Sequence, residues 1–189
     1  LTIHTAKRGS NKPNWEIAEE EEFDRLIGTK TIRPIWPKDQ PVDRKKDTTY
    51  YNPQTKEKIN EESKKTYRVR GTIGGDKINY PGEVSAQTAD MESVKFLVQA
   101  VLHDRHVKKQ NETEFITLDI KDYYLGAPLD RPEYVRIHRK FIPQKTIDKY
   151  NLEQYMHNDS VLFEVTKCMY GLPQAGYLSQ LRLIKQLKK

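Results

Sequence analysis

The stretch FITLDIKDYYLG, residues 115–126, combines residue types that could bind a metal ion and a nucleotide. Its apolar, β-forming start predicts a strand that presents Asp119 at its C-terminal end, where ligands commonly bind. A carboxylate there could hold Mg²⁺, which takes oxygen ligands. Tyr124, five residues later (124 − 119 = 5), could form the floor under a bound sugar and reject a 2′-hydroxyl. The alternatives are a turn or cap role for Asp119 and core packing for Tyr124.

Two further segments carry groups that suit phosphates and bases. In YRVRG, Arg68 and Arg70 alternate along a predicted strand and therefore project from the same face, where two guanidiniums could grip a triphosphate. The alternative is a solvated edge strand that its charges keep from pairing. In the turn LPQAG, Gln174 carries an amide that could contact a nucleotide or a template strand, and it follows Asp119 by 174 − 119 = 55 residues.

The charge of the chain is unevenly distributed. Its 189 residues include 33 Lys and Arg against 27 Asp and Glu, a net charge of +6, which suits a polyanionic partner and also a protein of mixed surface charge. One acid-free cluster consists of Lys64, Lys65, Arg68 and Arg70. The second follows the last acidic residue, Glu164, and consists of Lys167, Arg182, Lys185, Lys188 and Lys189. We expect two basic surfaces.

Cysteine usage and hydropathy exclude several classes of protein. The single cysteine, Cys168, excludes an internal disulfide and a zinc site built from several cysteines, and it favours a reducing compartment. No signal peptide or membrane-spanning run is predicted. The sequence begins with Leu1 instead of Met, and its last helical pattern has no terminating residue, so we expect an internal fragment of a longer protein.

The first half of the chain predicts one helix and three strands. Residues 1–13 lack periodicity and predict a flexible lead-in. A helix with Asn14 as its N-cap is expected to end at Gly28. Short strands are expected in TIRPIW and TTYY, then a charged hairpin or loop over residues 52–65, and then the strand TYRVRGTI at 66–73 before a turn.

The second half predicts a helix, three more strands and a final basic helix. Thr88 is a good N-cap, and an apolar stripe predicts a helix that packs on the core. The stripe consists of Met91, Val94, Leu97, Val98, Val101 and Leu102. Besides the strand at 115–118, strands are expected at 133–138 and 161–166, with a short helix near 147–155 and a helix from about residue 177. This order predicts an α+β domain with a mostly antiparallel sheet and supporting helices.

Five segments, in this order along the chain, resemble the reverse transcriptases of copia-type long-terminal-repeat retrotransposons. They are NWEIAEEEEFDRLIGTKTI, TYRVRGTIGG, INYPGEVSAQTADMESVKFLVQAVL, LDIKDYYLGAPLDRPEYVRIH and CMYGLPQAG. The resemblance covers most of the chain. It implies a partial right-hand polymerase over residues 1–189, with fingers at 1–87 and 125–172 and palm at 88–124 and 173–189, truncated before the Tyr-x-Asp-Asp hairpin.

The resemblance also implies a role for each candidate residue. Asp119 and the backbone carbonyl of Ile120 would bind two catalytic Mg²⁺ ions, which activate a primer 3′-hydroxyl and stabilise the leaving pyrophosphate. The incoming deoxynucleoside triphosphate would be bound by Arg68, Arg70, Asp122, Tyr123, Tyr124 and Gln174, with Tyr124 as the gate. The RNA template and DNA primer would be contacted by Lys64, Lys65, Arg182 and Lys185.

Two functions remain open at this point. The first is an RNA-directed DNA polymerase that is inactive as this fragment alone, because the carboxylates of the Tyr-x-Asp-Asp motif that complete the metal site are absent from the sequence. The second is a degenerate, non-catalytic remnant or nucleic-acid-binding module. If the chain is a polymerase, the resemblance implies two possible partners, the integrase and ribonuclease H segments of the same polyprotein. It also implies a cytoplasmic location, in a virus-like particle.

Overall fold

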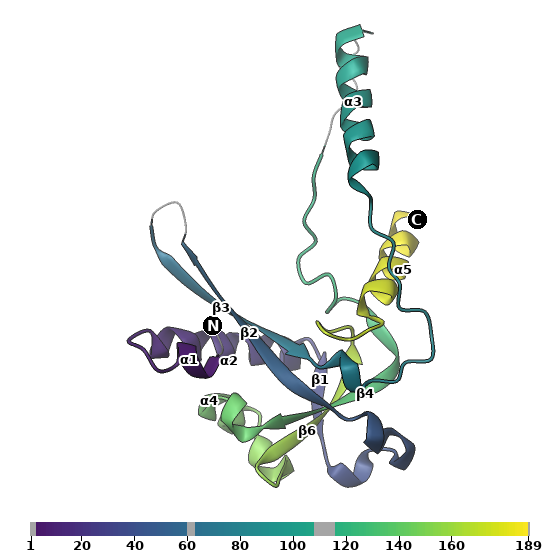
Figure 1. The fold of residues 1–189 in the computed structure, drawn as a ribbon. Coiled ribbons are helices and arrows are strands. Elements are labelled where there is room, and N and C mark those ends of the chain that lie inside the picture. Colours follow the sequence, from purple (N-terminus) through teal and green to yellow (C-terminus); the bar gives the residue numbers. More distant parts are fainter. Residues whose placement is uncertain (1–2, 60–62, 108–115, 189) are drawn as a thin grey trace.

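The protein is an α+β fold in which helices surround a curled sheet, as the sequence predicts. The computed structural model describes residues 3–59, 63–107 and 116–188 (Figure 1). The α-helices are α1 (Ile3–Ala6), α2 (Lys12–Gly28), α3 (Met91–Val107), α4 (Gln144–Lys149) and α5 (Ala175–Leu187). The 3₁₀ helices are η1 (Pro37–Asp39), η2 (Val42–Asp47), η3 (Gly75–Lys77), η4 (Arg139–Phe141) and η5 (Leu152–Tyr155).

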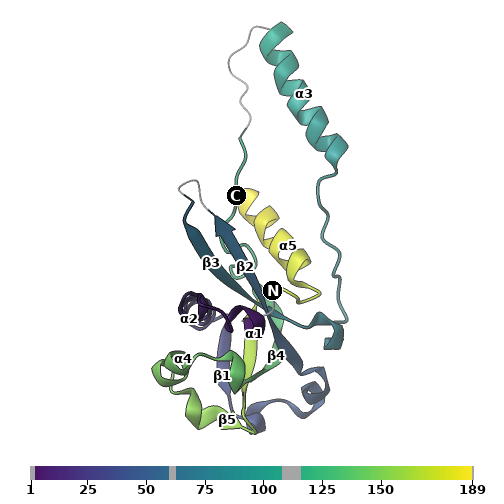
Figure 2. The same ribbon diagram turned by 60° about the vertical axis from the view of Figure 1, so that its left-hand side comes forward.

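The sheet is mostly antiparallel, as expected. Its strands are β1 (Ile32–Ile35), β2 (Thr49–Ile59), β3 (Lys65–Ile73), β4 (Pro128–His138), β5 (Met156–His157) and β6 (Ser160–Lys167). They run in the order β1-β6-β4-β2-β3, and β5 pairs with β6. Among the described strands, β2 and β4 pair in parallel, through Thr49 and Tyr50. Beyond these two residues, β2 pairs with β3 alone as a two-stranded ribbon (Figure 2).

The alternating pattern of the ribbon is confirmed. Val69, Gly71 and Ile73 of β3 are buried against α2 and the sheet, whereas Arg68 is exposed and Arg70 is half-buried on the opposite face. The two arginines therefore share a face, because side chains of a strand alternate with a period of two. Of the predicted charged hairpin or loop at residues 52–65, residues 52–59 belong to β2 and Lys65 begins β3, whereas residues 60–62 lie outside the described residues.

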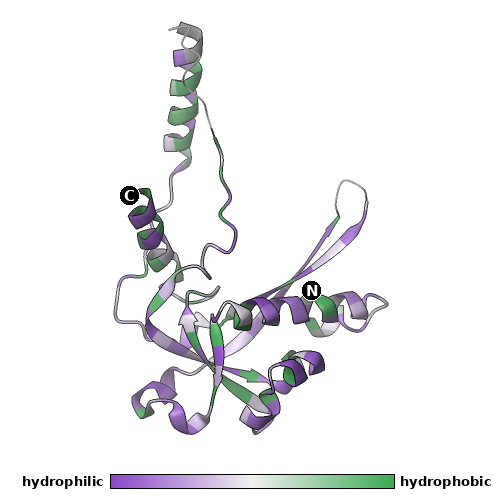
Figure 3. Ribbon diagram, turned by 180° about the vertical axis from the view of Figure 1, so that it is seen from behind, coloured by the Kyte–Doolittle hydropathy of each residue, from purple (hydrophilic) through white to green (hydrophobic). Residues whose placement is uncertain are grey.

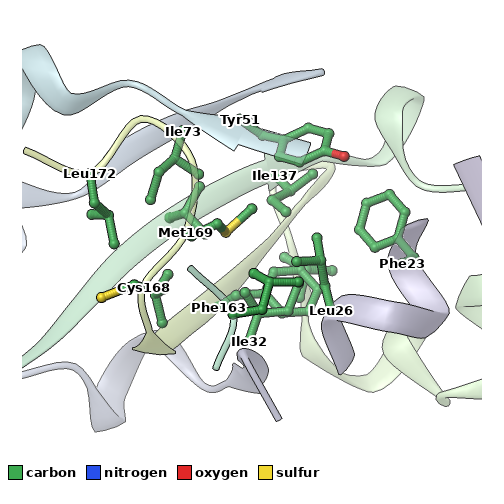
Figure 4. Packing of buried hydrophobic residues seen from close by; sticks show 14 of the residues in the cluster. Phe23, Leu26, Ile32, Tyr51, Ile73, Ile137, Phe163, Cys168, Met169 and Leu172 are labelled. Carbon is green, nitrogen blue, oxygen red and sulfur yellow. The ribbon is translucent and has the colours of Figure 1, made fainter. Parts of the chain in front are cut away.

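The core lies between α2, the sheet and the segment that follows β6 (Figure 4). Phe23 and Leu26 of α2 meet Ile32 and Phe163, and all four side chains are buried. The helix begins at Lys12, with a proline in its first turn, and not after Asn14 as predicted. The expected flexible lead-in is also wrong for its described part, because α1 packs Ile3 and Ala6 into a second apolar cluster.

The helix predicted from residue 88 is present but does not pack on the core. It begins at Met91, after Asp90, whose carboxylate accepts hydrogen bonds from the Ser93 backbone N–H (2.7 Å) and hydroxyl (2.8 Å). Its apolar side chains are largely exposed, and α3 stands apart from the sheet (Figures 1 and 3). The stripe predicted the helix correctly but its packing wrongly, because no described element lies against it.

The strand predicted at residues 115–118 is not observed where the structure describes it. Phe115 lies outside the described residues, and residues 116–120 form an irregular, exposed segment. No described strand pairs with this segment. A β-rich run without a partner leaves its backbone groups to water and gains no packing, so its propensity alone does not form a strand.

Candidate nucleic-acid interface

The outer face of the β2–β3 ribbon is a continuous basic surface. Lys56 lies opposite Arg68, and Gln54 lies opposite Arg70. We call this surface the basic ribbon face; it consists of Asn52, Gln54, Lys56, Lys58, Thr66, Arg68, Arg70 and Thr72. None of these eight residues is acidic. Part of the face lines a cavity of about 250 Å³. Closely spaced Lys and Arg with amides and hydroxyls between them suit phosphate oxygens.

Arg70 connects the basic ribbon face to a row of aromatic rings. Its guanidinium lies 4.3 Å from the centroid of the Tyr170 ring. Tyr170 makes an edge-to-face contact with Tyr124 (4.9 Å between centroids), and Tyr124 contacts Tyr123 (5.6 Å). We call Tyr123, Tyr124 and Tyr170 the tyrosine cluster. Three candidate segments, around residues 70, 124 and 174, therefore meet here, and Tyr170 is the member for which the sequence predicts no role.

The backbone of Tyr170 is fixed to the end of β3. The Ile73 N–H donates to the Tyr170 carbonyl (2.9 Å), and the next residue, Gly171, has a φ of 96°. A Cβ at Gly171 would overlap with the Ile73 carbonyl oxygen, and a Cβ at Gly75 would overlap with the Gly171 carbonyl. This crossing therefore requires glycine, both for its conformation and for the close approach of the two backbones. The sequence signal was the Tyr-Gly pair before LPQAG.

Asp122 is held in place by an ion pair with helix α2. It has a φ of 52°, and its carboxylate pairs with the Arg25 guanidinium, which also pairs with Glu22. Glu22 in turn accepts a hydrogen bond from the Gly71 N–H of β3 (2.6 Å). The turn that carries the tyrosines is thus tied to both α2 and β3 through charge-assisted hydrogen bonds.

Gln174 lies inside the protein. Its side chain is buried, and its Nε2 donates to Glu133 Oε1 (3.0 Å). Glu133 is also buried and accepts from Arg131 (3.0 Å) and Arg44 (2.5 Å). The amide that the sequence places against a nucleotide therefore orders β4 and the start of α5 in this structure. The sequence does not predict this role of Glu133, because two of its three partners, Arg44 and Gln174, lie 89 and 41 residues away along the chain.

The remaining predicted basic residues occupy three places. Lys65 pairs with Glu57 on the other face of the ribbon (2.6 Å), and Lys64 is exposed before β3. On α5, Lys185 is exposed, and the Arg182 guanidinium lies against Gly126, where a Cβ would overlap with it. Arg182 therefore reaches the turn that follows the tyrosine cluster, whereas Lys64 and Lys65 lie at the far end of the ribbon.

Among the described residues, no recorded contact joins Asp119 or Ile120 to the other candidate site residues. Both are exposed in the irregular segment 116–120. Among residues 3–59, 63–107 and 116–188, no three His, Cys, Asp or Glu side chains gather as a metal site would require. A Mg²⁺ pair needs several oxygen ligands, so the described residues do not by themselves fit the two ions that the resemblance implies.

Burial perturbs one further titratable group beside the site. Cys168 is buried next to Met169, and desolvation raises the pKa of its thiol to about 11. This thiol is therefore a core group at neutral pH and not a nucleophile.

The described helices were also assessed for membrane spans, and the chain was compared with known proteins. None of the described helices is both long and apolar enough to cross a bilayer. Comparison of the chain with protein-family models, with curated proteins and with solved structures gave no match.

Proposed function

We propose that the chain forms the fingers and part of the palm of a copia-type RNA-directed DNA polymerase, and that its basic ribbon face and tyrosine cluster bind nucleic acid and nucleotide phosphates. The observation that carries this proposal is the contact of Arg70 with Tyr170 and of Tyr170 with Tyr124. Three segments that resemble separate motifs of that family, and that are remote in sequence, supply its members. The family resemblance and the contact are independent observations.

The physical character of the surface supports the same proposal. Phosphates bind to Lys and Arg with release of counterions, and bases stack on aromatic and guanidinium planes. The basic ribbon face supplies the first kind of group, and the half-buried ring of Tyr170 with the Arg70 guanidinium supplies the second. A single-stranded template end or the triphosphate of an incoming nucleotide presents both phosphates and a base. The surface selects for this combination without reading sequence.

A second candidate function is a nucleic-acid-binding module without polymerisation. It needs only the basic ribbon face and the tyrosine cluster, and it gives no metal role to Asp119, which is exposed in the irregular segment 116–120. Both functions use the basic ribbon face in the same way. They differ only in whether binding leads to nucleotide incorporation, so we derive no chemical step through Mg²⁺ from this structure.

Binding is tested with a fluorescent primed RNA template and fluorescence anisotropy over a salt series. Arg68→Gln removes an exposed guanidinium from the basic ribbon face, and Lys95→Gln removes an equal charge from α3 as the control. We expect about tenfold weaker binding for Arg68→Gln, since a hydrogen bond to a charged group contributes about 1.5 kcal/mol or more. The slope of log K against log salt should fall by about 1. Equal losses in both variants would contradict the proposal.

Incorporation separates the two candidate functions. The reading frame is expressed with the sequence that continues it past Lys189, and Mg²⁺-dependent deoxynucleotide incorporation is assayed on the same primed RNA beside Asp119→Asn. Incorporation that is lost in Asp119→Asn while template binding persists supports the polymerase. Binding without incorporation in either protein supports the binding module.

A further inference from the structure

A second basic pocket lies on the sheet, away from the tyrosine cluster. It has a volume of about 760 Å³ and is lined by five basic side chains. These are Lys45, Lys77, Arg136, His138 and His157. Every other residue that lines it is uncharged, and several carry hydroxyl or amide groups. The volume falls in the range of small-molecule sites, about 300–1,000 Å³.

The basic residues of this pocket come from separate parts of the chain. Arg136 and His138 alternate along β4, and Arg136 lies opposite Tyr50 of β2. His138 and His157 both pair in register with Ser160 of β6. Lys45 and Lys77 are contributed by η2 and η3. The fold therefore gathers like charges that the sequence keeps apart, and this gathering costs electrostatic energy unless an anion offsets it.

The walls of the pocket are held by hydrogen bonds within the protein. Gln40 Nε2 donates to Thr48 Oγ1 (2.7 Å) and fixes the loop between η1 and β2. The Gly74 N–H donates to the Tyr50 carbonyl (3.0 Å), and the Tyr50 hydroxyl donates to Asp76 (2.9 Å). Asp76 does not line the pocket. The site is therefore shaped before any ligand arrives, which reduces the entropic cost of binding.

The basic groups of the pocket remain available to a ligand. No carboxylate of the described residues forms an ion pair with Lys45, Lys77 or Arg136. The Nζ of Lys77 lies 5.7 Å from the centroid of the Tyr50 ring. His138 Nδ1 accepts the Lys140 N–H (3.1 Å), so in the neutral ring Nε2 carries the hydrogen and can donate. The pocket thus offers three permanent cations and at least one further donor.

We propose that this pocket binds phosphate groups. Three permanent cations exceed the single charge of a carboxylate and match a phosphorylated ligand, whose several oxygens accept hydrogen bonds from a guanidinium fork and from ammonium groups. The phosphate can belong to a small polyphosphate or to the backbone of a polynucleotide. The pocket shares no lining residue with the basic ribbon face, so the proposal does not rest on the function proposed above.

The test is a titration of the ¹⁵N-labelled chain with inorganic triphosphate and, separately, with a single-stranded oligonucleotide, followed through amide shifts. We expect saturable shifts at Thr49 and Ser160, which lie at the pocket. Arg136→Gln should weaken the affinity at these amides about tenfold, since it removes a charge-assisted hydrogen bond. Lys95→Gln is the charge-matched control, and Arg68→Gln should leave these shifts unchanged while altering those of the ribbon.

The two arms distinguish the sources of the phosphate. Saturable shifts with triphosphate that weaken in Arg136→Gln assign the pocket to small phosphorylated ligands. Shifts with the oligonucleotide alone, weakened in the same variant, assign it to a polynucleotide backbone. Lys45→Gln must reproduce the effect, which excludes a local unfolding of β4 as its cause. The absence of shifts at Thr49 and Ser160 in both arms, or equal shifts in Arg136→Gln and the parent protein, would overturn the proposal.

Discussion

The apolar side chains of the sheet and those of α3 lie in opposite environments. Val135 and Phe163 of the sheet are fully buried, as is Phe23 of α2, whereas Phe96 of α3 is 72% exposed and Leu97 is 59% exposed. Both regions have a clear apolar pattern in the sequence, and both form the secondary structure that this pattern predicts. The difference shows that an apolar stripe specifies which face of an element could be buried, while a partner element decides whether burial takes place.

The largest expected difference between the two regions is in stability. Phe163→Ala should reduce the free energy of unfolding by about 3–5 kcal/mol, because it leaves a cavity in a filled core. The matched change Phe96→Ala in α3 should alter it by no more than about 0.5 kcal/mol, as for other exposed positions. Urea unfolding followed by circular dichroism measures both. Equal losses would mean that α3 is packed in solution, against the arrangement described here.

Thiol reactivity compares the same two regions without removing a packed group. Burial raises the pKa of Cys168 to about 11, so at pH 8 only about one thiol in a thousand is ionised. In a Cys168→Ser background, Leu97→Cys places a thiol on exposed α3, where a pKa of about 8.5 is expected. Native Cys168 should therefore react with iodoacetamide at least about 100-fold more slowly.

The rate of alkylation of Cys168 should also increase with pH. Because only the thiolate reacts, the rate for Cys168 should rise about tenfold per pH unit from pH 8 until pH approaches its pKa, whereas the rate on α3 should level off earlier. A native Cys168 that reacts as fast as the α3 thiol at pH 8 would show that the core opens on the timescale of the reaction.

The smallest of the three effects concerns the attachment of the tyrosine cluster to the sheet. Gly171→Ala should destabilise the fold by about 1–3 kcal/mol, since its φ is 96° and its Cβ would overlap with the Ile73 carbonyl. Gly28→Ala, at the end of α2 with open space around it, should be neutral or slightly stabilising. Thermal unfolding measures both. A Gly171→Ala variant as stable as the parent would mean that the turn can relax.

Local sequence patterns predicted the secondary structure that depends on neighbouring residues. The alternation in TYRVRGTI predicted both the strand β3 and the common face of Arg68 and Arg70. The mixed α+β class and the mostly antiparallel sheet also followed from the order of the segments. The helix α2 begins a few residues before the predicted N-cap Asn14, because Asn11 is its N-cap and Pro13 lies in its first turn.

The features that sequence did not predict depend on contacts between distant residues. The sequence predicts that the Gln174 amide contacts a nucleotide or a template strand, but the side chain is buried and donates to Glu133, which lies 41 residues earlier. The strand expected before Asp119 needs a neighbouring strand, and none of the described strands supplies one. The gathering of basic residues around Arg136 also arises only when β2 pairs with β4 and when β4 and β5 both pair with β6. Each of these outcomes was decided by tertiary contacts and not by local propensity.

The distal end of the ribbon, residues 56–59 of β2 and residues 65–66 of β3, is exposed and lies outside the core. Only Thr49 and Tyr50 join β2 to β4, while nine residues of β2 pair with β3. Insertions or deletions at the ribbon tip therefore leave the core contacts untouched, provided that both strands change by two residues at a time. An even change preserves which side chains face outward, since a strand alternates with a period of two. Evolution or an engineer can thus lengthen or shorten the basic ribbon face, and so set how many phosphates it spans, without redesigning the domain.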